Sequence, residues 1–493
     1  MSVLKVSGKN SLLRWLEHRF ILEKLNNPFG YVLLSLFALA MAYVLSVLPL
    51  KFSALLLGAL VGIPVVIYCF VNLHFGLLTM LTVSFLLGLA AKHTDAPIGT
   101  SMDGMLLLML FGLLVRLVKE RDYGFLRSPI TWFIVAWIYY NIMEVLNPVA
   151  GSRLAWVYTV RSVALLLSLY FIACYALNSL RRILTMTKAI IFLSFVAALY
   201  SLKQEFIGYS TAELNWLHAD EERFMLIYQW GRLRVFSFFS DPTTFGILMG
   251  YMSIFCFIVA TGPVKLWQRI ALLVSGVCML MGMAYAGSRT PFALVPLGAI
   301  FYIILNFNKK TLIGTSILLV LGAGMVMKST SNPVMYRIQS AFKPSEDASV
   351  HVRLENQRRI QPYIRSHPIG AGLGSTGAWG KRFTPDSWLA SFAHDSLYVR
   401  LAVETGYIGM LIYMGLLFTA MRLGIYYFFR CADPVIKNLY LAVTSTVFLL
   451  AVACYPQEAI TLPPTSIIFY IMLGMIVRLK DFDPNFRKAA PQG

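Results

Sequence analysis

The chain has 493 residues, of which 58% are hydrophobic and only 13% are charged. Soluble domains carry roughly 25% charged residues, so water is not the main solvent of this chain. A formal net charge of +19 would suggest nucleic acid as a partner of a soluble protein. In a membrane protein it first indicates orientation, because Lys and Arg are retained on the cytoplasmic side. Composition therefore predicts a membrane protein without a nucleic-acid partner.

The N-terminal part does not have the pattern of a cleavable signal. Residues 1–28 are predicted to be a cytoplasmic segment, and residues 11–25 within it are amphipathic and suited to the membrane surface. The first hydrophobic block, residues 29–48, is longer than the apolar region of a signal peptide and lacks a clear cleavage site. The six cysteines lie in or beside hydrophobic blocks without a C-x-x-C pair, which argues against disulfides and zinc.

Hydrophobic residues then recur in continuous blocks of about 20, the length of a helix that crosses a bilayer. Lipid offers the backbone no hydrogen bonds, so spanning segments are helices or closed barrels, and continuous rather than alternating blocks exclude a barrel. The sequence predicts an all-α polytopic protein with about 14 transmembrane helices, within a range of 12–14, because the turn near 288–291 leaves the count at 270–306 open. The predicted spans are 29–48, 52–70, 73–91, 104–118, 129–147, 157–177, 183–201, 241–261, 270–286, 290–306, 311–327, 397–421, 438–455 and 463–478.

Positive charge predicts how these spans are oriented. With the N-terminus in the cytoplasm, the cytoplasmic segments hold 23 Lys and Arg, and the short segments on the other side hold 5. The remaining 14 lie in two long outer regions, 202–240 and 328–400, and the positive-inside rule exempts such long loops. Both termini are therefore expected in the cytoplasm, including the tail 479–493. The transmembrane regions are 29–327, with an outer loop at 202–240, and 396–478.

One long polar loop, residues 328–395, separates the two transmembrane regions and is predicted to be extracytoplasmic and partly helical. A loop of this length in a compact protein is usually functional or disordered, and its aromatic residues argue against disorder. Residues 349–364 are predicted to form a short basic helix, and GAGLGST (370–376) a tight turn rather than a nucleotide loop. A solvated basic surface is the alternative interpretation of the helix.

Two segments at span ends could bind anions. In GSRTP (287–291), Ser288 can cap a helix, which would place Arg289 beside free backbone N–H groups; the alternative is an arginine that extends to lipid headgroups. In GRLRVFSFFSDPTTFG (231–246), Asp241 before a proline is more typical of a helix cap than of a catalyst. Arg234 in the same segment could hold phosphate or lipid headgroups equally well.

The span after the long loop begins with SFAHDSLYVRLAVETG (391–406). Arg400 and Glu404 are four residues apart, so they share a helix face and can pair. His394 lies at the boundary of loop and span, where a neutral imidazole could take a proton from a sugar hydroxyl. A capping or structural histidine is the alternative.

Three motifs in this order resemble the O-antigen ligase and O-antigen polymerase superfamily of bacterial envelope glycosyltransferases. They are YAGSRTPFALVPLGAIFYIIL (285–305), RLENQRRIQPYIRSHPIGAGLGSTG (353–377) and FAHDSLYVRLAVETGYIGMLIYMGLL (392–417). The chain departs from the family pattern at Thr290, where glycine is usual, and at Asp395, where asparagine usually follows the histidine. Asp395 could then raise the pKa of His394 or act as a second base.

The resemblance implies a GT-C-like transferase in the bacterial inner membrane that uses no metal or cofactor. Its donor would be a glycan on undecaprenyl pyrophosphate, and its acceptor a glycan or the lipid A core. His394 would deprotonate the acceptor, which attacks with inversion, while Arg289 and Arg234 neutralise the leaving pyrophosphate. Arg353, Arg358 and Arg359 would bind donor phosphate or acceptor glycan, and Arg400 and Glu404 are assigned to the same site.

Other functions stay open at this stage. A ligase, which transfers finished glycan, and a polymerase, which joins repeat units, need the same donor chemistry; the histidine-led span favours the ligase slightly. A transporter or flippase of lipid-linked oligosaccharides would spread ionisable residues through the middle of several spans. Here such residues lie toward the outer ends, as Glu144, Arg161 and Arg289 do. A non-catalytic scaffold of an envelope-polysaccharide complex is the third alternative.

Overall fold

The computed structural model describes residues 27–93, 98–121, 123–229, 231–309 and 348–487, with a few single positions between 312 and 339. The chain separates into two compact units, Met1–Tyr68 and Cys69–Gly493. The predicted amphipathic segment 11–25, most of the predicted span 311–327 and residues 328–347 of the long loop fall outside the described residues.

The first unit contains two apolar helices, α2 (Pro28–Val47) and the larger part of α3 (Leu50–Val71). Asn27 accepts a hydrogen bond from the N–H of Gly30 and Pro28 follows it, so α2 begins with a capping residue and a proline in the first turn. Side chains such as Phe29 and Tyr43 are exposed, as expected for a helix whose surroundings are lipid.

The second unit is a bundle of long helices with a small group of short elements. Each predicted span other than 311–327 coincides with a described helix, and ten described helices are long and apolar enough to cross a membrane. The protein is thus an all-α polytopic membrane protein, as its composition predicts. The elements are α4 (Leu73–Ala90), α5 (Ile98–Glu120), η2 (Gly124–Leu126), α6 (Pro129–Met143), η3 (Glu144–Leu146), α7 (Arg153–Ala176), α8 (Leu180–Phe206), α9 (Thr211–His218), α10 (Glu221–Ile227), β1 (Tyr228–Gln229), β2 (Arg232–Leu233), α11 (Pro242–Thr261), α12 (Leu266–Ala286), α13 (Arg289–Leu305), α16 (Ala348–Ser366), α17 (Gly377–Phe383), α18 (Trp388–Ser391), α19 (Leu397–Arg430), α20 (Pro434–Ala453), α21 (Thr465–Arg478), η5 (Leu479–Phe482) and α22 (Pro484–Arg487).

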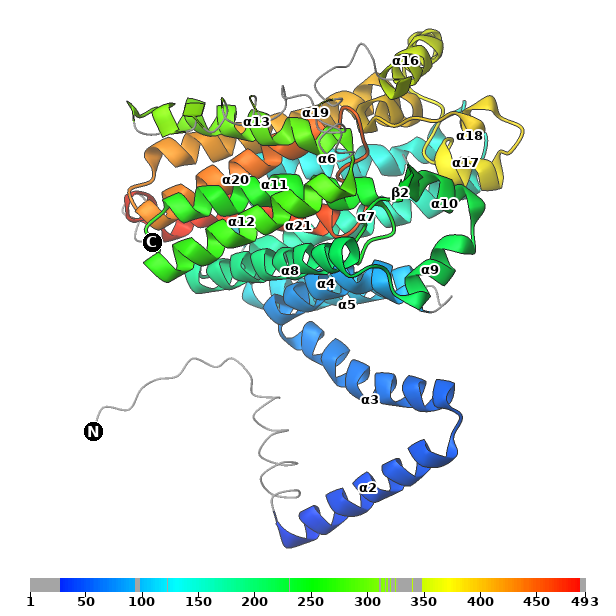
Figure 1. Ribbon diagram of the computed structural model, residues 1–493, viewed down its shortest axis with the longest axis vertical. Helices are drawn as coiled ribbons and strands as arrows, with labels where there is room; N and C mark the ends of the chain where they lie inside the picture. Colours follow the sequence, from blue (N-terminus) through cyan, green and yellow to red (C-terminus); the bar gives the residue numbers. More distant parts are fainter. Residues whose placement is uncertain are drawn as a thin grey trace. The chain divides into compact units, whose positions relative to one another are not determined.

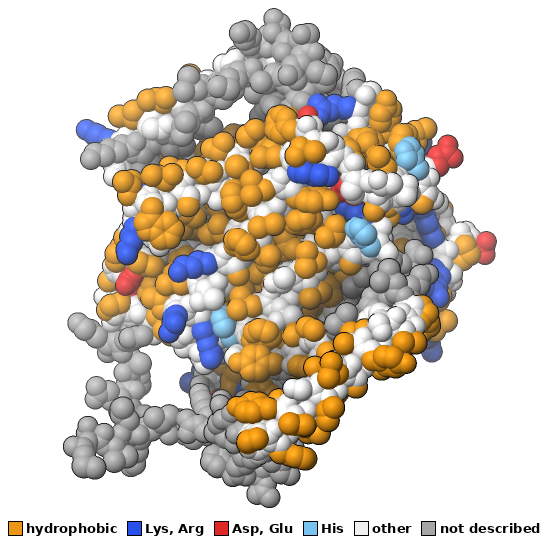
Figure 2. Space-filling view, turned by 60° about the horizontal axis from the view of Figure 1, so that its bottom comes forward, with side chains coloured by type: hydrophobic (Ala, Val, Ile, Leu, Met, Phe, Trp, Pro, Cys, Tyr) orange, Lys and Arg blue, Asp and Glu red, His pale blue; other side chains and the backbone are white. Residues whose placement is uncertain are grey.

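The long helices of this unit run side by side, and one group of short elements gathers at one end of them (Figure 1). That end carries α9, α10, the β1–β2 hairpin and α16 to α18, and we call it the loop-bearing end. Helices α11, α20 and α21 form the centre of the bundle and bury most of their side chains. The side of the protein seen in Figure 2 is largely apolar, with separate basic side chains among the apolar ones.

The turn at 288–291 separates two helices. Gly287 at the end of α12 has the left-handed φ of 61° that suits glycine, and α13 begins at Arg289. Ser288 occupies the predicted capping position, but its side chain makes no capping hydrogen bond. Asp241 is the helix cap that the sequence predicts, since its carboxylate accepts hydrogen bonds from the N–H and the hydroxyl of Thr244, at 2.7 and 2.8 Å.

The segment 202–240 is held to the bundle by a buried lysine. Lys92, just beyond α4, donates a hydrogen bond of 2.9 Å to the carbonyl of Ser237 and lies 4.3 Å from the centre of the Phe236 ring. Burial lowers the pKa of Lys92 to about 8, although the nearby Glu213 carboxylate acts in the opposite direction. The loop that carries Arg234 is therefore fixed on the end of α4.

Candidate active site

The imidazole of His394 is enclosed at the junction of α17 and α19. Its side chain is 9% exposed, and its Nδ1 lies 2.8 Å from Oε1 of Glu458, in the segment between α20 and α21. Both ring nitrogens are buried; the contact of Nδ1 with Glu458 is an ion-pair distance whose angles do not meet hydrogen-bond geometry, and Nε2 has neither a hydrogen bond nor a charged partner among the described residues. Gly377, at the start of α17, lies over this nitrogen, since a Cβ at that position would be 3.9 Å from Nε2. The carboxylate thus occupies one side of the ring and leaves the other nitrogen for a substrate.

A chain of charged and polar groups continues from Glu458 into the protein. Its Oε2 accepts a hydrogen bond of 2.8 Å from Arg400, and Arg400 is also paired with Glu404 at 3.4 Å. The other oxygen of Glu404 accepts a hydrogen bond of 2.5 Å from the hydroxyl of Thr376. The predicted pairing of Arg400 with Glu404 is confirmed, and each buried charge has a partner, as burial of charges requires.

This chain of contacts gives Glu458 the character of an ionised carboxylate. Burial alone would raise the pKa of Glu458, but the contact with His394 and the positive charge of Arg400 outweigh it and lower the pKa below its ordinary value. An anionic Glu458 favours the tautomer of His394 that carries its proton on Nδ1, which leaves the lone pair on Nε2. That arrangement is the one that a general base requires.

Two of the sequence motifs meet in space to build this site. Helix α19 is broken at Gly406, whose φ is 63°, and the turn after His367 fits into the break. The N–H of Tyr407 donates to the carbonyl of Pro368 at 3.0 Å, and the N–H of Ala371 donates to the carbonyl of Val403 at 2.7 Å. A Cβ at position 406 would lie 2.1 Å from the Pro368 oxygen, so this approach requires glycine. These bonds hold the turn 368–371 against the first turns of α19.

The start of α19 is also joined to the end of α20. Ser396 is the cap of α19, its hydroxyl donates to the carbonyl of Cys454 at 3.4 Å, and the N–H of Leu397 donates to the same carbonyl at 3.0 Å. These bonds bring the segment after α20, and Glu458 with it, to His394. Glu458 was not predicted from the sequence, because 64 positions separate it from His394. The available signal was a lone acid in a short segment between two apolar spans.

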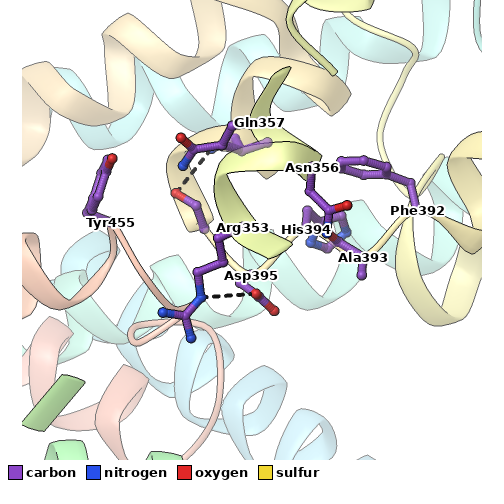
Figure 3. Close-up of a pocket in the computed structure, with 10 residues that line it drawn as sticks. Arg353, Asn356, Gln357, Phe392, Ala393, His394, Asp395 and Tyr455 are labelled. Atoms are coloured by element: carbon purple, nitrogen blue, oxygen red, sulfur yellow. Dashed lines mark hydrogen bonds and ion pairs between the residues drawn. The ribbon is translucent and has the colours of Figure 1, made fainter. Parts of the chain in front are cut away.

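A small hollow of about 20 Å³ adjoins His394 between α16 and the start of α19. Arg353 and Asn356 of α16 line it, and Phe392 and Tyr455 lie toward opposite sides of it (Figure 3). Asp395 is paired with Arg353, its Oδ2 lying 3.2 Å from the guanidinium Nε, so the carboxylate in contact with His394 is that of Glu458 and not that of the neighbour in sequence. The hollow has room for about one water molecule, so a sugar must widen it.

The other predicted site residues lie in two places. Helix α16, which coincides with the predicted basic helix, carries the exposed Arg358 and Arg359, and Arg359 pairs with Glu355 at 3.2 Å. Arg234 is buried near the start of α13, where its Nε donates a hydrogen bond of 2.9 Å to the carbonyl of Ala286. Arg289 is half-buried at the first position of α13, so these two arginines belong to the same part of the loop-bearing end.

A larger cavity of about 450 Å³ lies near this second group, between α4, the start of α5, the start of α11 and the segment 454–464. Asp241, Phe239 and Leu462 are among its lining residues. Among the described residues, no group of three or more His, Cys, Asp or Glu side chains is arranged to hold a metal ion. The same segment that carries Glu458 therefore also borders this cavity.

The fold and the site define a class: a polytopic α-helical membrane protein with a half-buried histidine–carboxylate pair at one end of its helices. A comparison with protein-family models is more specific, because residues 274–414 match the model described as O-antigen ligase. The match runs from within α12 into α19, so it covers the first two motifs and all but the last three residues of the third, and it confirms the resemblance to the O-antigen ligase superfamily. A comparison with curated proteins gives no match.

Proposed function

We propose that the protein transfers a glycan from undecaprenyl pyrophosphate to an acceptor hydroxyl, with His394 as the general base. The observation that carries the proposal is the His394–Glu458 contact of 2.8 Å together with the buried, unpartnered Nε2. A base needs a free lone pair and a stabilised conjugate acid, and this pair supplies both. The O-antigen ligase match over residues 274–414 supports the choice of a lipid-linked glycan as donor.

The proposed reaction is a single displacement at the anomeric carbon of the donor. The acceptor oxygen attacks this carbon while its proton passes to Nε2 of His394. The bond from the carbon to the phosphate oxygen breaks, and undecaprenyl pyrophosphate leaves with the electron pair, so the configuration at the carbon inverts. Glu458 accepts a hydrogen bond from Nδ1–H and stabilises the imidazolium that forms. No metal takes part in this scheme.

The arginines have different parts in the proposal. Arg400 and Glu404 contact Glu458 and Thr376, so they act as positioning residues that hold the pair rather than as ligands of the substrate. Arg289 and Arg234 would offer positive charge to the leaving pyrophosphate at the N-terminus of α13. The basic residues of α16, which are Arg353, Arg358 and Arg359, would bind donor phosphate or acceptor glycan.

We propose the bacterial inner membrane as the location, with both termini in the cytoplasm and the loop-bearing end outside it. The charge distribution of the sequence supports this orientation. We favour a ligase over a polymerase of repeat units because the histidine-led start of α19 is the clearer family feature. In both cases the donor and the base are the same, so the acceptor decides between them.

The test is transfer by the purified protein in lipid nanodiscs with synthetic undecaprenyl-pyrophosphate-linked glycan. We expect product with lipid A core as acceptor, with and without EDTA, and loss of product in His394→Ala while the variant still binds the donor. Loss of transfer in the presence of EDTA would refute the metal-free mechanism. Elongation of the donor glycan without any core acceptor would identify a polymerase. Movement of intact donor across the bilayer without new glycosidic bonds would identify a transporter.

A further inference from the structure

Helix α16 closes one side of the hollow beside His394. The hollow of about 20 Å³ has room for about one water molecule, and three of its lining residues, Arg353, Asn356 and Gln357, belong to α16. Both ring nitrogens of His394 are buried. A general base must come within about 2.6–3.2 Å of the oxygen whose proton it takes. A sugar hydroxyl therefore reaches His394 only if a wall of the hollow moves aside.

The two halves of α16 are attached to the protein in different ways. The C-terminal half is anchored by packing, because Ile360 is 1% exposed and lies in an apolar cluster with side chains of α18 and α19. Tyr363 adds a ring stack on His367, with a centroid distance of 4.0 Å. In the N-terminal half no side chain that the structure describes is buried, and Val352 and Leu354 are exposed. This half has no packing that fixes its position.

Two polar contacts hold the N-terminal half of α16 beside His394. The guanidinium Nε of Arg353 lies 3.2 Å from Oδ2 of Asp395, the residue after His394, and Figure 3 shows this contact as a dashed line. The side-chain amide of Asn356 donates a hydrogen bond of 3.3 Å to the carbonyl of Ala393, the residue before it. The side chains of the ion pair are 28% and 44% exposed, and ion pairs in contact with water are weak. The contacts that close the hollow are therefore easily broken.

A proline gives α16 a place to bend. Pro362 lies inside the helix and has no N–H, so the carbonyl of Arg358 lacks the donor that a helix normally provides four residues later. Sharp bends of helices occur at such positions. The turn that ends at Pro362 joins the anchored half of α16 to the half that the two polar contacts hold.

We propose that the N-terminal half of α16 is a lid over His394, latched by Arg353 and Asp395 and hinged at Pro362. Opening separates the latch, frees Arg353 for substrate and widens the hollow for an acceptor sugar; this consequence rests on the proposed function. The fraction of open lid sets how readily an acceptor reaches the base. Loss of one weak ion pair should raise that fraction about twofold to fivefold.

The lid is tested by the rate at which diethyl pyrocarbonate modifies His394 in the full chain in maltoside, with each modified histidine located by mass spectrometry. The reagent reacts with a neutral imidazole that it can reach, so the rate follows the open fraction. We expect Asp395→Asn and Arg353→Gln each to raise the rate at His394 about twofold to fivefold. The exposed His218 is the internal reference. Asp386→Asn, which removes an exposed charge between α17 and α18, is the matched control and should leave the rate at its wild-type value.

The two latch variants separate lid movement from an effect of charge on the imidazole. Loss of the negative charge of Asp395 favours the neutral imidazole, which reacts, whereas loss of the positive charge of Arg353 favours the protonated form, which does not. A charge effect alone therefore predicts opposite changes, and lid opening predicts a rise in both variants. Any result other than a rise in both would overturn the latch.

Replacement of the proline tests the hinge. Pro362→Ala supplies the missing donor to the carbonyl of Arg358, which should stiffen α16 and slow the modification of His394 at least twofold. An unchanged or faster rate would overturn the hinge.

The transfer reaction tests what the lid does. Asp395→Asn should lower the acceptor KM about twofold to fivefold, because more of the protein is open to the acceptor. An acceptor KM at or above the wild-type value, in a variant whose His394 is modified faster, would refute the role of the lid in acceptor entry. Absence of transfer in the wild type would refute the proposed function, and the modification rates would still decide the lid.

Discussion

Replacement of Glu458 by glutamine tests the histidine–carboxylate pair. The variant keeps the size of the side chain but removes the charge that lies 2.8 Å from His394 Nδ1 and 2.8 Å from Arg400. A hydrogen bond to a charged partner contributes about 1.5–3 kcal/mol, and its loss in the transition state corresponds to roughly 10- to 150-fold in rate. The amide can also donate to Nδ1, which would move the proton of His394 to Nε2 and abolish the base. We therefore expect kcat to fall about 10³-fold.

The assay is the initial rate of glycan transfer by protein in nanodiscs, with donor and acceptor varied separately. The donor KM should stay within threefold of the wild-type value, because Glu458 contacts His394 and Arg400 and not the donor. Glu458→Asp should recover part of the lost rate, whereas a purely structural role predicts no recovery once the proteins are equally folded. Asp395→Asn is the comparison, since that carboxylate pairs with Arg353 and should change kcat far less. A folded Glu458→Gln protein with a kcat within threefold of wild type would refute the role of Glu458 as the partner of His394 in catalysis.

The remaining predictions concern stability and geometry. The lowered pKa of Glu458 stabilises the folded protein at pH values above about 4.3, the ordinary pKa of a glutamate. This stabilisation is lost as pH falls through the lower pKa of the folded state. The melting temperatures of wild type and Glu458→Gln should therefore converge in acid. Because burial lowers the pKa of Lys92 to about 8, the free energy of unfolding should increase as pH rises from 8 toward 10.5, the ordinary pKa of a lysine. Lys92→Met should lack this increase. An identical increase in both proteins would contradict the role of Lys92. Arg234→Leu leaves the carbonyl of Ala286 without its donor and should destabilise by about 2–3 kcal/mol in chemical denaturation; a change below about 0.5 kcal/mol would count against that hydrogen bond. Gly377→Ala places a side chain at φ 62° over His394, so it should cost about 1–2 kcal/mol and lower kcat without affecting donor affinity; unchanged kcat would show that the space above Nε2 is not used.

Continuous hydrophobic blocks were sufficient to predict most of the fold, because lipid imposes helices on every apolar block of this length. The break in α19 at Gly406 could not be predicted in this way. A glycine within an apolar block does not reveal that a distant turn packs against it. The cap at Asp241 and the pair of Arg400 with Glu404 were predictable because they depend on residues three or four positions apart. The cap expected from Ser288 does not form.

The candidate site was predictable only in part, because one of its two central residues comes from a distant segment of the chain. His394 was found from the sequence because it starts a span, but the carboxylate beside it was assigned to the adjacent Asp395. The structure turns Asp395 toward Arg353 of α16 and brings Glu458 from the segment after α20. That pairing is set by the bonds between the start of α19 and Cys454, which a single sequence does not reveal.

His394 is the proposed base of a transfer from a lipid pyrophosphate. The most direct measurement is the single-turnover rate of protein already loaded with undecaprenyl-pyrophosphate-linked glycan, mixed with saturating acceptor, in wild type and in His394→Ala, with the anomeric configuration of the product read by NMR. The account predicts an inverted product and a rate at least 10²-fold lower in the variant at equal donor occupancy. A wild-type rate in His394→Ala, or a product with retained configuration, would contradict it.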